Sequence, residues 1–120
     1  KNSSATFNKK LWLALDIKGE IMADTSRSSG VLGASAIVSK TQCRLKSIHA
    51  NLVIASNAAV TVKVFDGQDN SGTEIARIHN TTTGQYNLEY DMHGVLCTGG
   101  IFLEITEAGS SAAHISVEFN

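Results

Sequence analysis

Proline is absent from this sequence of 120 residues, and cysteine and aromatic residues are scarce, with two Cys, one Trp, two Tyr and four Phe. Without proline, the turns between elements must be made by Gly, Asn, Asp and Ser. Two cysteines, Cys43 and Cys97, are too few for a disulfide scaffold, and their spacing does not match the common zinc frameworks. We expect both to be buried free thiols, because free cysteine is among the most buried residue types. A bond between them is the alternative.

Long apolar runs and a large net charge are also missing. No stretch approaches the roughly 20 apolar residues that span a bilayer. The net charge of −1 argues against a dedicated nucleic-acid binder. Hydrophobic residues make up 42% of the chain and charged residues 18%, which is typical of a globular protein. A chain of this length is expected to form one domain that buries a core without metal or disulfides.

Charge is unevenly distributed along the chain. Residues 1–46 carry eight basic and three acidic side chains, whereas residues 47–120 carry two basic and eight acidic ones. Such asymmetry indicates a polar contact. We interpret residues 1–40 as a basic N-terminal segment with one or two strands that acts as a docking arm, and residues 41–120 as the body, within one domain overall. The arm would bind an acidic neighbour, including the acidic half of a second copy.

The dominant pattern is an alternation of apolar and polar side chains with a period of two, which predicts β-strands. Residues 11–17 place Leu and Ile on one face, and this alternation outweighs the helical spacing that residues 7–17 also contain. A possible return strand covers residues 20–24, and the Ser/Gly-rich residues 25–33 predict a loop. Residues 34–39 are a short apolar run. Further strands are expected at residues 43–55, 59–66, 73–79, 85–92, 95–98, 101–106 and 112–119.

About eight short strands with turn residues between them are typical of a sandwich or barrel. The alternation gives each strand one wet face, which favours antiparallel sheets over a buried parallel sheet. We therefore predict an all-β fold, a single antiparallel β-sandwich of jelly-roll type. Its edge strands need cover, so we also expect a homo-oligomer, with a trimer favoured.

Catalytic patterns are hard to find in this sequence. It has no G-x-S-x-G elbow, no S-x-x-K, no H-E-x-x-H and no Gly-rich phosphate loop ending in Lys-Ser/Thr. Two histidines and a carboxylate can bind a metal, but no spacing here demands such a site. We therefore predict a protein that is not an enzyme, with no catalytic residues, no metal and no cofactor. The histidines are expected at the surface: His49, His79, His93 and His114.

Acidic and amide side chains cluster in and beside the turn DGQDNSG. Their offsets resemble a calcium loop superficially but do not match the EF-hand pattern. Asn and Asp also favour turns because they hydrogen-bond their own main chain, and we favour this interpretation. Calcium binding remains the alternative. The residues concerned are Asp66, Asp69, Asn70 and Glu74.

From Arg44 onward, the sequence resembles a known group of proteins. The stretches RLKSIHANLVIASNAAVTVKVFDGQDNSGTEIARI and GVLCTGGIFLEITEAGSSAAHISVEF resemble small virion proteins of tailed bacteriophages. In that group, R-L-x-x-I-H leads to V-K-V-F/Y-D-G and an S-G-T turn, and G-V-x-x-x-x-G-I/L-F/Y-L/V-x-I precedes a final alternating strand. The matching segments here are Arg44–His49, Val62–Gly67, Ser71–Thr73, Gly94–Ile105 and Ala113–Phe119.

The resemblance implies a non-enzymatic β-sandwich on the surface of a phage particle, such as a capsid decoration (cement) protein, a head fibre or knob, or a tail adaptor. A decoration protein would bridge neighbouring subunits of the major capsid protein and stabilise the head, with no nucleic-acid or membrane partner. The alternative is a carbohydrate- or receptor-binding module of a tail or fibre, which predicts exposed rings around Tyr86, Tyr90 or Trp12. The resemblance does not cover residues 1–43, where charge and Trp12 suggest these partner contacts: Phe7, Lys9, Lys10, Trp12, Arg27 and Lys40.

Overall fold

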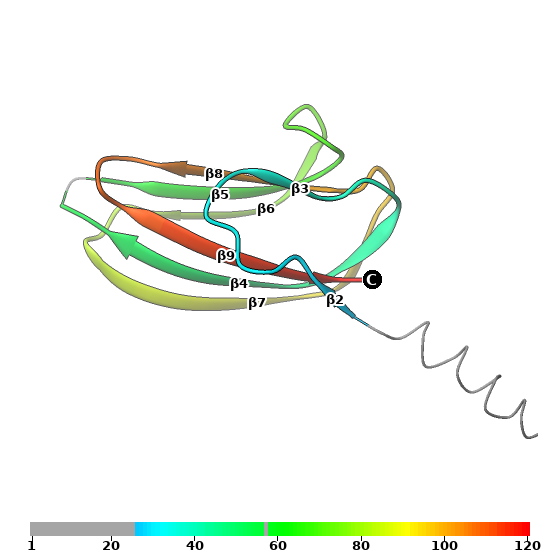
Figure 1. Cartoon of the computed structure of the whole chain (residues 1–120), viewed down its shortest axis with the longest axis horizontal. Helices are drawn as coiled ribbons and strands as arrows, with labels where there is room; N and C mark the ends of the chain where they lie inside the picture. The colour runs from blue at the N-terminus through cyan, green and yellow to red at the C-terminus, as the bar shows by residue number, and fades with distance from the viewer. Residues whose placement is uncertain (1–25, 57) are drawn as a thin grey trace, which may run out of the picture.

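The structure, a computed structural model, describes residues 26–56 and 58–120, and regular structure in these residues is entirely β. No helix in this part of the chain is long and apolar enough to cross a membrane. The strands, labelled as in Figure 1, are β2 (Arg27–Ser28), β3 (Ala36–Ser39), β4 (Cys43–Ile54), β5 (Val60–Asp66), β6 (Thr73–Asn80), β7 (Gly84–Cys97), β8 (Ile101–Glu107) and β9 (Ala112–Phe119).

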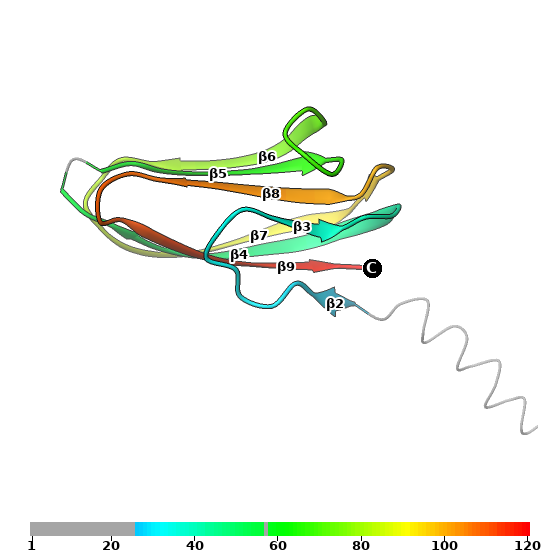
Figure 2. The ribbon, with the colours of Figure 1, turned by 45° about the horizontal axis from the view of Figure 1, so that its top comes forward.

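The strands form two four-stranded antiparallel sheets that lie face to face (Figure 2). The first sheet has the order β2-β9-β4-β7, and the second has the order β3-β8-β5-β6. Among these eight strands, only β5 and β6 are consecutive and pair with each other, since every other connection between them crosses from one sheet to the other. This order is that of a jelly roll. The expected fold class, an antiparallel jelly-roll sandwich of about eight strands, is confirmed.

The core lies between the two sheets and follows the alternation of the sequence. In β4, every second residue from Ile48 to Ile54 is buried, and β5 and β9 show the same pattern. Because successive side chains in a strand point to opposite faces, one face of each strand meets the other sheet and one faces outward. The most completely buried large side chains are Leu45, Ile48, Leu52, Ile101, Leu103, Ile115, Val60, Val62, Val64 and Val117.

Most expected strand positions in the described residues are confirmed, with two differences. The loop expected at 25–33 contains the two-residue strand β2, which pairs with the end of β9. The strands expected at 85–92 and 95–98 are one strand, β7, with an irregularity between them. The strands expected at 11–17 and 20–24 lie outside the described residues. The eight observed strands therefore agree with the expected number, but they are not the same set of strands.

The irregularity in β7 explains why the sequence suggested two strands. His93 and Gly94 both have positive φ, 56° and 73°, a conformation that interrupts regular pleating. The β4–β7 pairing shifts register there, from Ser47 opposite Asp91 to Leu45 opposite Val95. The Asp91 carboxylate accepts a hydrogen bond from the His93 backbone N–H at 2.9 Å, which stabilises the bend. Pairing then resumes, so β7 continues as one strand.

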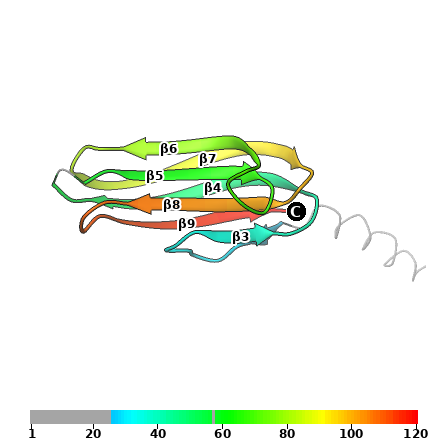
Figure 3. The same ribbon diagram turned by 90° about the horizontal axis from the view of Figure 1, so that it is seen from above.

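The four edge strands differ strongly in length. β2 and β3, on one side of the sandwich, have two and four residues, whereas β6 and β7, on the other side, have eight and fourteen (Figure 3). Short edge strands offer few unpaired backbone groups, and long ones offer many. The β6–β7 side is therefore the side of the described body that is open to pairing with another strand.

Residues 26–40 contribute β2 and β3 to the two sheets, so the sandwich includes part of the segment that we interpreted as an arm. Residue 26 leads into β2 opposite Phe119, at the end of the body where β9 finishes. The turns at 40–42 and 98–100 lie at this same end, and Gly100 there has no room for a side chain against the Ser39 carbonyl. We call this end, formed by residues 26–27, 40–46 and 94–100, the arm end.

Replacing Leu52 with Ala tests the placement of the core. Leu52 is fully buried in β4, whereas Leu96 is 44% exposed in β7. We expect Leu52→Ala to lower the free energy of unfolding by about 2–5 kcal/mol, because it removes buried methyl groups and leaves a cavity. The matched variant Leu96→Ala should change it by about 0.5 kcal/mol or less. Urea unfolding followed by circular dichroism measures both, and equal losses would contradict this core.

Candidate functional site

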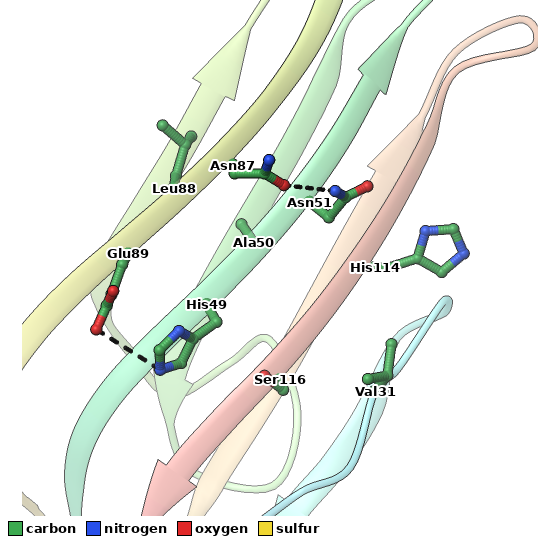
Figure 4. Close-up of a pocket in the computed structure, with 9 residues that line it drawn as sticks. All are labelled: Val31, His49, Ala50, Asn51, Asn87, Leu88, Glu89, His114 and Ser116. Atoms are coloured by element: carbon green, nitrogen blue, oxygen red, sulfur yellow. Dashed lines mark hydrogen bonds and ion pairs between the residues drawn. The ribbon is translucent and has the colours of Figure 1, made fainter.

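A polar depression lies on the outer face of the first sheet, across β9, β4 and β7 (Figure 4). Its volume is about 330 Å3, and it is open to solvent. Val31, on the segment between β2 and β3, stands at its margin and is 72% exposed. The remaining lining residues are His49, Ala50, Asn51, Asn87, Leu88, Glu89, His114 and Ser116.

Strand register arranges the polar side chains of the depression in two rows. One row runs Glu89–His49–Ser116 and the other Asn87–Asn51–His114, because each of these residues is a direct cross-strand partner of the next. In the second row, the Asn51 amide N–H donates to the Asn87 Oδ1 at 2.6 Å. In the first row, the His49 Nε2 lies 4.0 Å from the Glu89 Oε2. The face therefore presents a flat grid of donors and acceptors.

A serine, a histidine and carboxylates meet beside this grid, but not in the geometry of a hydrolase. The Ser47 hydroxyl lies 3.3 Å from the His49 Nε2 and donates to the Glu118 Oε1 at 2.9 Å. A catalytic triad needs the carboxylate on one ring nitrogen and the nucleophile on the other. Here Ser47 and Glu89 both approach Nε2. These contacts satisfy the buried Ser47 hydroxyl, which is 8% exposed.

The four histidines are exposed, as expected, and they lie on different parts of the surface. His79 has its Nδ1 2.8 Å from the Thr61 hydroxyl on the outer face of the second sheet. His93 has its Nδ1 3.5 Å from Asp91 in the bend of β7. Within residues 26–56 and 58–120, no group of three or more His, Cys, Asp or Glu side chains is placed to hold a metal ion.

The carboxylates around the DGQDNSG turn each have a separate structural partner. Asp66 accepts hydrogen bonds from the backbone N–H groups of Thr98 and Gly99, at 3.3 and 2.8 Å, and so ties this turn to the β7–β8 turn. Asp69 accepts from the Ser71 N–H at 2.9 Å, and the Ser71 bonds lower the Asp69 pKa. This is the main-chain role that we favoured for the Asx-rich turn.

Glu74, the last of these carboxylates, is paired with a neighbour on its own strand. Its two oxygens accept from the Arg77 guanidinium at 2.6 and 2.8 Å, and this hydrogen bonding lowers the Glu74 pKa. The carboxylates of the turn thus point to different partners rather than toward one shared position. These partners are enough to explain why the turn contains these carboxylates, and a bound ion is not needed for that explanation.

Cys43 and Cys97 are buried free thiols, as expected. They are direct cross-strand partners on β4 and β7 at the arm end. Burial, with smaller effects from Cys43 and Asp66, raises the pKa of Cys97 to about 11. The thiol therefore stays protonated and acts as an apolar side chain of the core, not as a nucleophile.

Two of the six expected partner contacts fall within the described residues, and both lie at the arm end. Arg27 is in β2 and Lys40 is in the turn before β4, and both are exposed. The Lys40 backbone carbonyl accepts a hydrogen bond from the Gln68 side chain at 3.0 Å, which fixes this turn while leaving the ammonium group free to face solvent. The other expected contacts lie outside the described residues: Phe7, Lys9, Lys10 and Trp12.

Sequence reasoning missed two neighbours of these residues, Arg44 and Leu96. They are cross-strand partners at the arm end, and both are exposed. The Arg44 guanidinium donates to the Gly94 carbonyl at 3.3 Å. The charge excess of residues 1–46 already contained Arg44, which follows Lys40 by four residues, and strand pairing places Arg27 at the same end.

The tyrosines do not form the exposed aromatic cluster that a carbohydrate-binding face would use. Tyr86 is half-buried against the core, and its hydroxyl donates to the Thr82 carbonyl at 3.0 Å. Tyr90 is 41% exposed but faces the gap between the sheets, where it lines a groove with β6. Neither ring lines the polar depression. Trp12 lies outside the described residues.

Comparisons with known proteins give no relative for this chain, since neither a protein-family model nor a curated protein matches it.

The buried Cys97 thiol predicts a specific dependence of stability on pH. Its folded-state pKa of about 11 lies above the ordinary value of 9.0, so between these pH values the unfolded chain loses a proton that the folded chain keeps. The free energy of unfolding should therefore fall as pH rises from 9 to 11, by up to about 2–3 kcal/mol from this group.

Urea unfolding of the reduced protein at pH 8, 9, 10 and 11 measures this effect. Cys97→Ala serves as the reference, because every other titrating group is unchanged in it. The decline should be steeper in the unmodified protein than in Cys97→Ala, and parallel declines would show that the thiol is not buried as described.

Proposed function

We propose that this chain is a non-enzymatic structural protein of a tailed-phage virion, a decoration protein that bridges neighbouring subunits of the major capsid protein. The jelly roll supports this proposal, because viral capsid domains use this fold, although lectin domains use it as well. A fold alone does not determine function. The proposal therefore depends on what the surface of this particular jelly roll presents.

The observation that carries the proposal is the composition of the arm end. Arg27 is on β2, Lys40 lies in the turn before β4 and Arg44 is at the start of β4, and all three are exposed there. Leu96, which is 44% exposed, is the cross-strand partner of Arg44 and supplies an apolar contact. Arginine and large apolar side chains are enriched at protein interfaces. The arm end thus presents basic side chains and apolar area where the N-terminal segment joins the body, beside the turn that carries Asp66 and Asp69.

A docking end of this kind suits a protein that acts in many copies. Each contact to an acidic capsid surface can be weak, because a copy that engages two neighbouring subunits binds with the avidity of both contacts. Many bridging copies would add interface area that resists pressure from inside the head. The location proposed for the chain is accordingly the outer surface of the particle, with a homotrimer as the favoured form.

A second candidate is a carbohydrate- or receptor-binding module of a phage tail or fibre. The polar depression favours it, because the rows containing Asn51 and His114 present donors and acceptors suited to sugar hydroxyls. Among the described residues no aromatic ring lines this depression, so the contacts that they offer to a sugar are hydrogen bonds. Binding to a glycan array that disappears in Asn51→Ala and persists in Lys63→Gln would favour this candidate over the first.

Sedimentation with capsids tests the decoration role. Capsids of the phage that encodes the chain, prepared without it, are mixed with the full-length protein and pelleted. The double variant Arg27→Gln/Lys40→Gln should bind at least tenfold more weakly, whereas Lys63→Gln/Arg77→Gln, which removes equal charge from the second sheet, should bind like the unmodified protein. Equal binding of all three proteins, or no binding to the particle, would overturn the proposal.

A further inference from the structure

We propose that the free edge of β7 is a docking site for a β-strand, and that its occupant is residues 11–17 of a second copy of this chain. The contact would join copies by strand addition, in which main-chain hydrogen bonds provide affinity and alternate side chains fill pockets. Three independent features support it: the unpaired edge, the groove beside that edge and the charge of the two partners.

The edge of β7 is long and regular over its first eight residues. β7 pairs with β4 on one side, and no strand of residues 26–56 and 58–120 pairs with its other side. From Gly84 to Asp91 the pairing with β4 runs without a register shift, and the bend follows at His93 and Gly94. Natural proteins protect such edges with short strands, lysines or bends. This stretch has no lysine, proline or bend, and its only charged side chains are those of Glu89 and Asp91, which a basic partner strand would neutralise.

An apolar groove runs between this edge and β6, the edge strand of the other sheet. It has a volume of about 230 Å3. Tyr90 is 41% exposed in it, and Ile75, on the opposite wall, is the residue of β6 at which the pairing with β5 shifts register. The groove is lined by Ile48, Ile75, Ala76, Arg77, Ile78, Tyr90 and Met92.

Residues 11–17 have the pattern that this edge and groove require. The segment LWLALDI places Leu11, Leu13, Leu15 and Ile17 on one face. When a strand with this alternation pairs with β7, those side chains lie on the same side of the sheet as Tyr86, Leu88 and Tyr90. Of these, Tyr90 lines the groove, and Tyr86 and Leu88 pack against the core. An antiparallel register with Leu11 beside Tyr90 sets Leu13 beside Leu88 and Leu15 beside Tyr86.

Charge favours the same pairing and the same register. β7 carries Glu89 and Asp91 on its outward face and contains no Lys or Arg. Residues 9–18 carry three lysines and one aspartate. With Leu11 beside Tyr90, Lys10 lies beside Asp91 on the outward face and diagonally adjacent to Glu89, both within the range of cross-strand pairs. Asp16 then lies beside Gln85, away from both carboxylates.

The length of the connecting chain assigns this strand to a second copy. Arg27 pairs with Phe119, Phe119 with Leu45, and Leu45 with Val95. Measured along the strands, residue 26 therefore lies near the position of Val95. In the antiparallel register, residue 18 would lie beyond Gly84, across the full width of the sheet from β2. The distance between residues 18 and 26 would then be about 35 Å. The chain from residue 18 to residue 26 spans at most about 29 Å. A copy therefore cannot fill its own edge in this register, and each copy offers one arm and one edge to its neighbours.

The contact between copies does not require the virion role. Failure of the strand contact appears in the mass of the free protein, whereas failure of the decoration role appears only in sedimentation with capsids. The two proposals can therefore be overturned separately.

A face-specific lysine scan of the full-length protein tests the strand contact. Sedimentation-velocity ultracentrifugation of the unmodified protein should show an oligomer. Leu13→Lys places a charge on the face that enters the groove and should yield monomers. Ala14→Lys adds the same charge to the opposite face of the same segment, near Glu89, and should leave the oligomer intact. A monomeric unmodified protein, or equal effects of the two substitutions, would overturn the proposal.

A charge exchange tests the partner edge. Lys10→Glu should weaken association at least fivefold, and Glu89→Lys should weaken it comparably, while the double variant should recover most of the loss. Glu104→Lys, on the outer face of the second sheet, is the matched control and should associate like the unmodified protein. Hydrogen exchange should show slow amides from Gly84 to Met92 in the oligomer and fast amides in the Leu13→Lys monomer. An absence of recovery in the double variant would refute this register.

Discussion

The burial of one face of every long strand against the opposite sheet is the constraint on which the rest of this structure depends. Ile48, Leu52 and Ile54 in β4 meet the buried valines of β5 across the gap between the sheets. Apolar burial of this kind supplies most of the favourable free energy of folding. A shift of one residue would turn an entire apolar face outward, so the core also determines which polar side chains lie outside. The grid around His49 and Asn51 is a consequence of this register.

The same constraint explains how much of the fold the sequence predicted. Where one face is buried and the other is wet, as in β4, β5 and β9, the alternation marked both the strand and its core residues. The alternation failed to predict the strands correctly where the backbone conformation of a few residues determines how the strands pair. His93 and Gly94 looked like a break, but the left-handed bend returns β7 to its pairing with β4. β2 has two residues in a Ser/Gly-rich stretch and is defined by its partner β9 rather than by its own pattern.

The surface was less predictable because it depends on which strands become neighbours. Arg27 and Lys40 were expected contacts on grounds of charge, but the position of Arg27 at the same end as Lys40 and Arg44 follows from the pairing of β2 with β9 and of β9 with β4. The rows of the polar depression likewise join residues more than 30 positions apart, as in the Asn51–Asn87 pair. Polar side chains occupy every second position in β4, at His49 and Asn51, and in β9, at His114 and Ser116. This pattern predicted a polar face on each strand, but it did not predict that the two faces are adjacent.

The crossing connections of the jelly roll also affect how the molecule reaches its native state. Apart from the β5–β6 hairpin, each sheet joins strands that are distant in sequence, and β9 is the one partner of β2 among the described strands. Loop-closure entropy must be overcome before such pairings become favourable, so folds of this kind form in milliseconds to seconds rather than microseconds. During synthesis on the ribosome, the first sheet lacks its β9 strand until residues 112–119 have emerged. The long edge of β7 is therefore present before the sheet that contains it is complete. During this interval, the edge must not pair with a wrong strand.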